Sequence, residues 1–233
     1  VTTNSFGDRE TNRIYITVVE TEYREMDRWH QWSNGGGSSL ELTDPDADPL
    51  EAANWADSDE SSKAPWTTIN VVGNLDHGME NYPPNRFQMG LMGAGECLVD
   101  DVEFFKTNGG NLVSNGDFEG GESWEFAGNH ERSRIQTGGA FSGSRCLHLV
   151  ALGDGDTGPN SVRTSIGSPP TPTGQGNIRA RVRWLRGWPE ILMRTRGNWI
   201  EAYGRLTVPA NLGSPGQPNS RRVSNAGPVI TEV

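Results

Sequence analysis

The chain has 233 residues, of which 30 are Gly, 14 are Pro and 8 are Trp, and its net charge is −10. Because Gly and Pro break helices, this composition argues against a helical bundle, and no apolar run approaches the ~20 residues that a membrane-spanning helix needs. The net acidity argues against a nucleic-acid partner, since phosphate contacts need a basic face.

Short segments rich in β-branched and aromatic residues recur along the first half of the chain, with turn signals between them. They predict strands at residues 13–23, 40–42, 66–72, 86–91 and 97–105. Residues 44–65 are acidic and rich in turn formers, which indicates a long loop. Within 86–91 the alternation places Phe87, Met89 and Leu91 on one inward face.

The second half repeats this pattern with segments at 111–119, 142–149, 178–184 and 198–208. In residues 178–184 the apolar side chains alternate with Arg179, Arg181 and Arg183, so the strand has one apolar face and one cationic face. The sequence therefore predicts an all-β protein with two tandem antiparallel β-sandwich domains of jelly-roll type.

Charge is divided unevenly along the chain, which suggests where the two domains meet. Residues 1–110 hold 20 acids and 7 bases, a net of −13, and residues 111–233 have a net of +3. We therefore predict a linker at 107–110 between an acidic sandwich and a second one. The predicted segments are an N-terminal linker at 1–12, sandwiches at 13–106 and 111–210, and a Pro/Gly-rich tail with a spare strand at 211–233.

The segment Asn111-Leu-Val-Ser-Asn-Gly-Asp-Phe-Glu119, followed by Trp124 and by Ser142-Gly-Ser-Arg-Cys-Leu-His-Leu149, resembles bacterial carbohydrate-binding modules of the jelly-roll (galactose-binding-like) type. The first half resembles them through Gly37-Ser-Ser-Leu-Glu-Leu42 and Leu98-Val-Asp-Asp-Val102. Three further stretches resemble segments of very large secreted bacterial proteins that combine such modules with lamin-tail-like domains: Asn54-Trp-Ala-Asp-Ser-Asp-Glu60, Arg183-Trp-Leu-Arg-Gly-Trp-Pro-Glu190 and Gly213-Ser-Pro-Gly-Gln-Pro-Asn-Ser220. The resemblance implies two copies over residues 13–208 in a multidomain extracellular or cell-surface protein.

Calcium is the cofactor that the resemblance implies. It would use Glu119 in the second copy and Asp100 or Asp101 in the first. Asp44 and Asp46 form a further carboxylate cluster, and carboxylate oxygens are the ligands that calcium prefers. The alternative for these acids is a solvated acidic loop.

A glycan is the partner that the aromatic residues suggest, because sugar rings stack on exposed aromatic faces beside polar groups. Trp199, Glu201 and Tyr203 share the polar face of one predicted strand, and the resemblance adds Trp124 to the binding candidates. The alternative is that these aromatic side chains pack under a loop or against the other half.

The cationic strand face suggests an interface. Arg179, Arg181 and Arg183 suit anionic sugars or sulfate, or the acidic first half of the same chain or of the next one. A solvated strand face is the ordinary alternative. The two cysteines, Cys97 and Cys146, are interpreted either as small buried hydrophobes or as a disulfide between the halves.

The sequence contains no nucleophile elbow, P-loop or zinc-protease motif, and its four histidines are scattered. We therefore expect a non-catalytic, calcium-stabilised carbohydrate-binding module pair. A rival hypothesis is a structural subunit of a surface appendage, which assembles head to tail through its opposite charges or its C-terminal strand.

Overall fold

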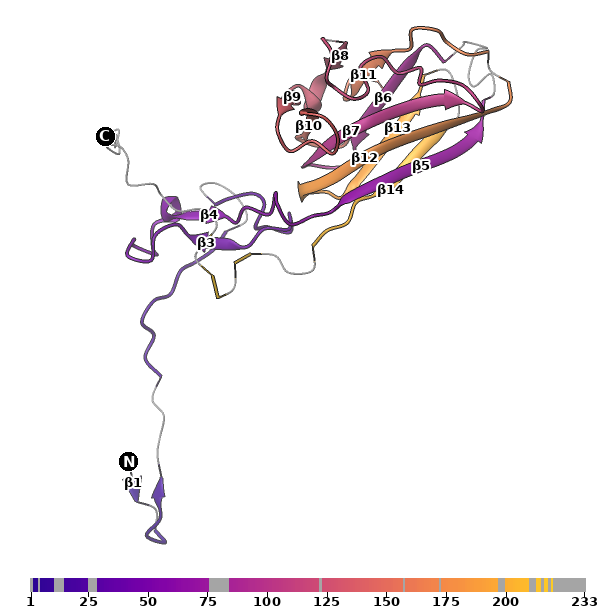
Figure 1. The fold of residues 1–233 in the computed structure, drawn as a ribbon. Helices are drawn as coiled ribbons and strands as arrows, with labels where there is room; N and C mark the ends of the chain where they lie inside the picture. The colour runs from indigo at the N-terminus through magenta and orange to yellow at the C-terminus, as the bar shows by residue number, and fades with distance from the viewer. Residues whose placement is uncertain are drawn as a thin grey trace, which may run out of the picture.

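The computed structural model describes residues 2–3, 5–10, 15–24, 29–75, 84–121, 123–156, 158–171, 173–196, 200–209, 213–214, 216–217 and 219. Two five-stranded antiparallel sheets lie face to face (Figure 1). The first consists, in spatial order, of β5 (Trp66–Asn74), β12 (Gln175–Gly187), β7 (Gly95–Lys106), β10 (Arg145–Ala151) and β9 (Arg134–Thr137). The second consists of β14 (Glu201–Arg205), β13 (Glu190–Thr195), β6 (Arg86–Leu91), β11 (Val162–Ser165) and β8 (Trp124–Phe126). The all-β prediction, with antiparallel sheets in a β-sandwich, is confirmed.

Strand pairing corrects the predicted division into two sandwiches. In the first sheet β12, from the second half, pairs with both β5 and β7 from the first half. In the second sheet β6 pairs with β11 and β13. The predicted linker at 107–110 therefore lies within one sandwich, which in the described residues extends from β5 to β14. The reason is that alternation shows which segments are strands but carries no information about which strands pair.

The core lies between the two sheets and is built from the alternating side chains that the sequence places inward. Ile178, Ala180, Val182 and Trp184 of β12 are buried, as are Phe87, Met89 and Leu91 of β6. These side chains belong to one continuous apolar cluster that also includes Phe104 of β7. The period-two pattern therefore predicts the buried faces correctly.

Residues 111–118 continue the first sheet beside β7 without forming a regular strand. The N–H of Leu112 donates to the Phe104 carbonyl, and the N–H of Val102 donates to the Gly116 carbonyl, both at 2.8 Å. A Cβ at position 116 would lie 2.0 Å from the Val102 carbonyl oxygen, so this approach requires glycine. Glu119 follows this segment directly.

The two cysteines are free and buried. Cys97 lies in the core between the sheets, whereas Cys146 joins a small apolar cluster with Leu98 and Leu185. Burial raises the pKa of the Cys146 thiol to about 11 and that of the Cys97 thiol still further. The interpretation as buried hydrophobes is the one that the structure supports.

The residues before the sandwich form a small unit of their own, here called the N-terminal module (residues 29–64). Its strands β3 (Leu40–Leu42) and β4 (Trp55–Asp57) pair antiparallel, and the 3-10 helix η1 (Ala52–Asn54) precedes β4. A second 3-10 turn, η2 (Gly128–His130), follows β8 in the sandwich. Figure 1 shows the module beyond the end of the sandwich where β5 begins. The predicted loop at 44–65 thus contains a short strand.

Further towards the N-terminus, β1 (Thr2–Thr3) pairs with β2 (Arg9–Glu10). The predicted strand at 13–23 is not found in its described part: residues 15–23 have no strand pairing, and Tyr15, Ile16 and Val18 are exposed. The spare strand predicted near the C-terminus, at 227–233, lies outside the described residues.

Candidate functional site

The sequence-predicted sugar-binding residues that the structure describes fall in two different environments. Glu201 and Tyr203 lie on the outer face of β14, because Ala202 between them is buried. Trp199 lies outside the described residues. Trp124 is only 8% exposed and packs in the core against Phe87 and Phe118. Trp124 is therefore a core residue, and its prediction as a sugar platform is corrected.

A single carboxylate, Glu190 at the start of β13, organises the exposed aromatic residues of this face. Trp188 Nε1 donates to Glu190 Oε2 at 3.0 Å, and Arg205 Nη1 donates to Oε1 at 2.7 Å. A hydrogen bond with Tyr203 is the main influence that holds the pKa of Glu190 below its ordinary value, and the same bond raises the pKa of Tyr203. Trp188 is 49% exposed and Tyr203 is 54% exposed, so both present open ring surface.

A cleft of about 430 Å³ lies beside Trp188, between the N-terminal module and the β12–β13 turn. Its lining combines aromatic, amide and backbone groups, including Trp32, Trp188, Gln31, Asn34, Arg205 and the glycines at 35–37. The module is fixed to the sandwich here, since the N–H of Gly187 donates to the Gly36 carbonyl at 2.7 Å. The cleft therefore depends on how these two parts of the chain are joined.

Glycine is required at two positions for this geometry. A Cβ on Gly93 would lie 2.6 Å from Trp188 Cγ, so the indole could not keep its place. Gly187 has a φ of +76°, and a Cβ there would lie 2.5 Å from the Ala94 carbonyl oxygen and 2.7 Å from Trp32. These two positions allow the indoles of Trp32 and Trp188 to border the same cleft.

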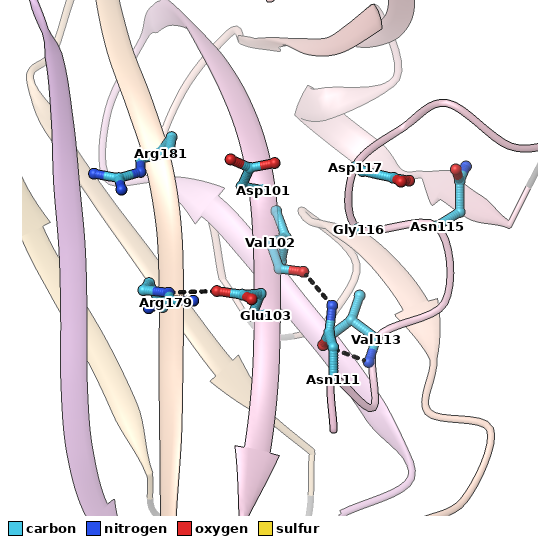
Figure 2. Close-up of a pocket in the computed structure, with 10 residues that line it drawn as sticks. All are labelled: Asp101, Val102, Glu103, Asn111, Val113, Asn115, Gly116, Asp117, Arg179 and Arg181. Carbon is cyan, nitrogen blue, oxygen red and sulfur yellow. Dashed lines mark hydrogen bonds and ion pairs between the residues drawn. The ribbon is translucent and has the colours of Figure 1, made fainter. Parts of the chain in front are cut away.

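A second cleft, also of about 430 Å³, lies on the outer face of the first sheet (Figure 2). Its lining is mostly polar and charged: Asp101, Glu103, Asn111, Asn115, Asp117, Arg179 and Arg181, with Val102, Val113 and Gly116. Aromatic residues do not line it. This separates it from the aromatic cleft beside Trp188.

Two arginines of the predicted cationic face, Arg179 and Arg181, line this second cleft and contact other side chains of the same chain. Arg179 forms an ion pair with Glu103. Arg181 donates to Thr68 Oγ1 and lies over the Phe141 ring at 4.6 Å from its centroid. Arg183 lies in register with Trp66 of β5. Arg179 thus makes the contact with the acidic first half of the same chain, which is one of the alternatives for this face.

The carboxylates predicted to hold calcium do converge, but on backbone N–H groups. Asp100 accepts the N–H groups of Phe141 and Ser142 at 2.8 and 3.0 Å, and Asp101 accepts the Ser142 hydroxyl. Glu119 accepts the N–H of Ser144 and of Arg145 at 2.6 and 2.7 Å. These bonds hold the pKa of Glu119 below its ordinary value, whereas burial raises that of Asp100.

This arrangement does not fit a cation, because N–H dipoles point their positive ends at the carboxylates. Asp44 and Asp46 lie far along the chain in the N-terminal module, where Asp44 accepts the N–H of Asp46 at 2.9 Å. In the part of the chain that the structure describes, no three His, Cys, Asp or Glu side chains gather as metal ligands.

Sequence reasoning identified Tyr203 and missed its partners Trp188, Glu190 and Arg205. The signal was present: Trp188-Pro189-Glu190 interrupts two alternating segments, so the indole belongs to a turn. An aromatic residue in a turn between strands lies at the rim of a sandwich rather than in its core.

Comparison with protein families, with curated proteins and with solved structures finds no match to the chain. Among the described residues, none of the helical segments is long and apolar enough to cross a membrane.

Proposed function

We propose that this chain is a non-catalytic carbohydrate-binding region of an extracellular or cell-surface protein, and that its binding site is the aromatic cleft beside Trp188. The observation that carries the proposal is the set of three hydrogen-bonded partners around Glu190, which fixes two exposed aromatic rings: Trp188, which lines a cleft of about 430 Å³, and Tyr203 on β14. Ligand sites in proteins are commonly about 300–1,000 Å³.

The chemistry of the cleft suits a sugar. The apolar C–H face of a sugar ring packs on an exposed indole or phenol ring, and Trp188 and Tyr203 supply these. Hydroxyl groups at the rim of the sugar need donors and acceptors, which the amides of Gln31 and Asn34 and the guanidinium of Arg205 provide. Because Glu190 already holds the rings in place, little side-chain freedom is lost on binding.

A panel of polysaccharides in affinity gels, followed by calorimetry on those that retard the protein, tests the proposal. We expect dissociation constants between about 1 μM and 1 mM. Trp188→Ala should weaken binding at least about tenfold, which corresponds to about 1.4 kcal/mol. The matched control is Phe141→Ala, because Phe141 is also a partly exposed ring but lies on the outer face of the other sheet.

Two results would overturn the proposal. One is the absence of retardation by any polysaccharide in the panel. The other is an equal loss of binding in Trp188→Ala and in Phe141→Ala, because that would separate binding from the cleft.

A structural subunit that assembles into a filament is the second candidate, and the exposed segment at 15–19 favours it. Tyr15 is 86% exposed and Val18 is 91% exposed, although both are typical strand residues. Such a segment can add to the sheet edge of a neighbouring copy. Light scattering with Val18→Lys tests this: assembly of the native chain that the variant abolishes supports it, and a monomeric native chain at high concentration contradicts it.

A further inference from the structure

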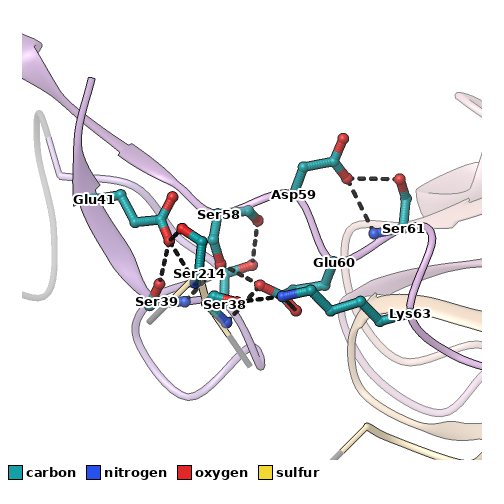
Figure 3. A network of polar contacts seen from close by, with 10 residues as sticks. Ser38, Ser39, Glu41, Ser58, Asp59, Glu60, Ser61, Lys63 and Ser214 are labelled. Atoms are coloured by element: carbon teal, nitrogen blue, oxygen red, sulfur yellow. Dashed lines mark hydrogen bonds and ion pairs between the residues drawn. The ribbon is translucent and has the colours of Figure 1, made fainter. Parts of the chain in front are cut away.

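Two buried carboxylates of the N-terminal module face a segment that lies more than a hundred residues further along the chain. Glu41 of β3 is 8% exposed, and Glu60, three residues after β4, is 2% exposed. Figure 3 shows both acids in a network of serines with Lys63 and with Ser214 of the C-terminal tail. Buried carboxylates need hydrogen-bond donors. The donors that the tail supplies to Glu41 and Glu60 therefore indicate which chemical groups this site recognises.

Gly213 is bound through its backbone. Its N–H donates to Glu60 Oε1 at 2.8 Å, and its carbonyl accepts Lys63 Nζ. Lys63 also forms an ion pair with Glu60 at 2.8 Å, and Ser58 donates its hydroxyl to the same carboxylate. One residue of the tail is thus held at both its donor and its acceptor.

Ser214 is bound through its backbone and its side chain. Its N–H donates to Glu41 Oε1 at 2.9 Å, and its hydroxyl donates to the same oxygen. Ser39 donates to that oxygen at 3.1 Å. Asn219 then donates its side-chain amide to the carbonyl of Leu42, the last residue of β3.

The tail has the shape that these contacts need. Gly213 has a φ of +80°, and a Cβ there would lie 2.5 Å from Ser39 Oγ, so only glycine fits. After it, the sequence Ser214-Pro-Gly-Gln217 suits a type II turn, with Gly216 at a φ of +71° and the N–H of Gln217 donating to the Ser214 carbonyl at 3.1 Å.

We propose that residues 38–63 form a peptide-binding site for an extended Gly-Ser segment followed by a Pro-Gly turn, and that the tail fills it here through Gly213, Ser214 and Asn219. The specificity comes from the two carboxylates, which read two successive backbone N–H groups and one hydroxyl. Without the tail, Glu60 would lose the N–H of Gly213, and Glu41 would lose the N–H and the hydroxyl of Ser214, which makes occupancy favourable.

The sandwich brings the module and the tail close together. Its two ends lie side by side, since Thr67 Oγ1 and Thr207 Oγ1 are 3.2 Å apart at the start of β5 and just after β14. The sandwich is therefore an insertion between the module and the tail. A short linker, residues 206–212 with the sequence Leu-Thr-Val-Pro-Ala-Asn-Leu, joins β14 to Gly213. The path of the chain brings the tail near the module, and the hydrogen bonds of Gly213, Ser214 and Asn219 fix it there.

A cut in this linker tests the proposal in the full chain. A recognition sequence for a site-specific protease is inserted after Pro209, the folded protein is cleaved, and the products are separated by gel filtration. We expect the tail fragment to elute with the rest of the chain, and a synthetic peptide of residues 210–220 to displace it. Elution of the fragment as a free peptide from a body with unchanged circular dichroism would overturn the proposal.

Two glycine variants of the tail form a matched pair. Gly213→Ala and Gly216→Ala both place a Cβ on a residue with positive φ, but a Cβ on Gly216 meets nothing within 4 Å. The displacing peptide with Ala at 213 should therefore be at least about tenfold weaker than the one with Ala at 216, a difference of about 1.4 kcal/mol. Equal weakening in both peptides would contradict the assigned contacts.

Discussion

In the sandwich most of the buried side chains are apolar, whereas in the N-terminal module most of them are polar. Phe87, Phe104 and Leu149 are examples from the sandwich core. The module buries Glu41, Asp57, Ser58 and Glu60, with Ala56 and Ala64 as its only buried apolar residues among those described. The sandwich therefore gains stability from many small non-directional contacts, and the module from a few directed hydrogen bonds.

The difference has a functional consequence, because the aromatic cleft lies where the two parts meet. Trp188 and Arg205 come from the sandwich, and Trp32 comes from the module. One side of the cleft is fixed by a close-packed core, and the other by hydrogen bonds that a single substitution can remove.

The largest effect is expected from a core truncation in the sandwich. Phe104 of β7 is fully buried, so Phe104→Ala should lower the free energy of unfolding by about 3–5 kcal/mol through lost burial and a cavity. The matched control is Phe6→Ala, because Phe6 is 90% exposed, and its effect should stay within about 0.5 kcal/mol. Chemical denaturation measures both; similar losses would contradict the assigned core.

Acid should destabilise the sandwich through His130, a fully buried residue of η2. Its Nε2 accepts the N–H of Leu91 at 3.1 Å, and its Nδ1 pairs with Asn129 Oδ1, so the ring fits as the neutral form. Burial lowers its pKa to about 4, although Asp156 opposes the shift. Below about pH 6.5 the unfolded state binds a proton at His130 that the folded state does not bind. The contribution of His130 to stability is therefore complete above about pH 6.5 and is lost as the pH falls towards about 4.

The size of this loss follows from the two pKa values. At about pH 5 the contribution of His130 should have fallen by about 2 kcal/mol relative to neutral pH. Denaturation across this range in the native chain and in His130→Asn should show a shallower pH dependence in the variant. A His130 resonance that titrates near its ordinary value in the folded protein would contradict the prediction.

In the module, Asp57→Ala should loosen the loop that carries Trp32. The Asp57 carboxylate accepts the N–H of Ser33 at 2.7 Å and that of Trp32 at 3.1 Å, and it is buried. Loss of such bonds costs about 1–3 kcal/mol, so hydrogen exchange at these two amides should accelerate about tenfold to a hundredfold. The matched control is Asp48→Ala, which removes an acceptor of one N–H, that of Leu50, on an exposed turn. Unchanged exchange at Ser33 in Asp57→Ala would contradict the role assigned to Asp57.

Local pattern predicted most of the sandwich strands. The bounds 86–91 coincide with β6, and the inward face of β12 is the apolar face of the predicted strand at 178–184. These two predictions are correct because the alternation of apolar and polar side chains is a property of each strand by itself. Pairing is not local, so the sequence could not show that β12 lies between β5 and β7.

The candidate site was only partly predictable for the same reason. Tyr203 was found because its face follows from alternation along β14. Glu190 and Arg205 lie opposite each other across two strands, so their contact depends on register, and Trp32 comes from another unit of the chain. Trp124 was predicted as a sugar-binding residue because its motif resembles a binding element. Its burial against Phe87 and Phe118 depends on strand pairing between the two halves of the chain, which the motif does not show.

The smallest effect on the melting temperature is expected from treatment with a chelator. The sequence alone predicts a calcium-stabilised fold, which a chelator would destabilise. Glu119 already accepts two backbone N–H groups and the Ser144 hydroxyl, and Asp100 accepts the N–H groups of Phe141 and Ser142. A bound cation would have to displace these donors, which sit at hydrogen-bond distance without it. Excess chelator should therefore leave the melting temperature unchanged.

Glu119→Ala is the positive control for the chelator experiment. This substitution removes the carboxylate that accepts the N–H groups of Ser144 and Arg145 between β9 and β10, so it should lower the melting temperature without chelator. If chelator lowers the melting temperature of the native chain, and elemental analysis finds calcium before but not after treatment, the N–H contacts of Glu119 and Asp100 belong to a cation-free state. The carboxylates must then turn away from the N–H groups when the ion binds, and Glu119→Ala should abolish the response to chelator.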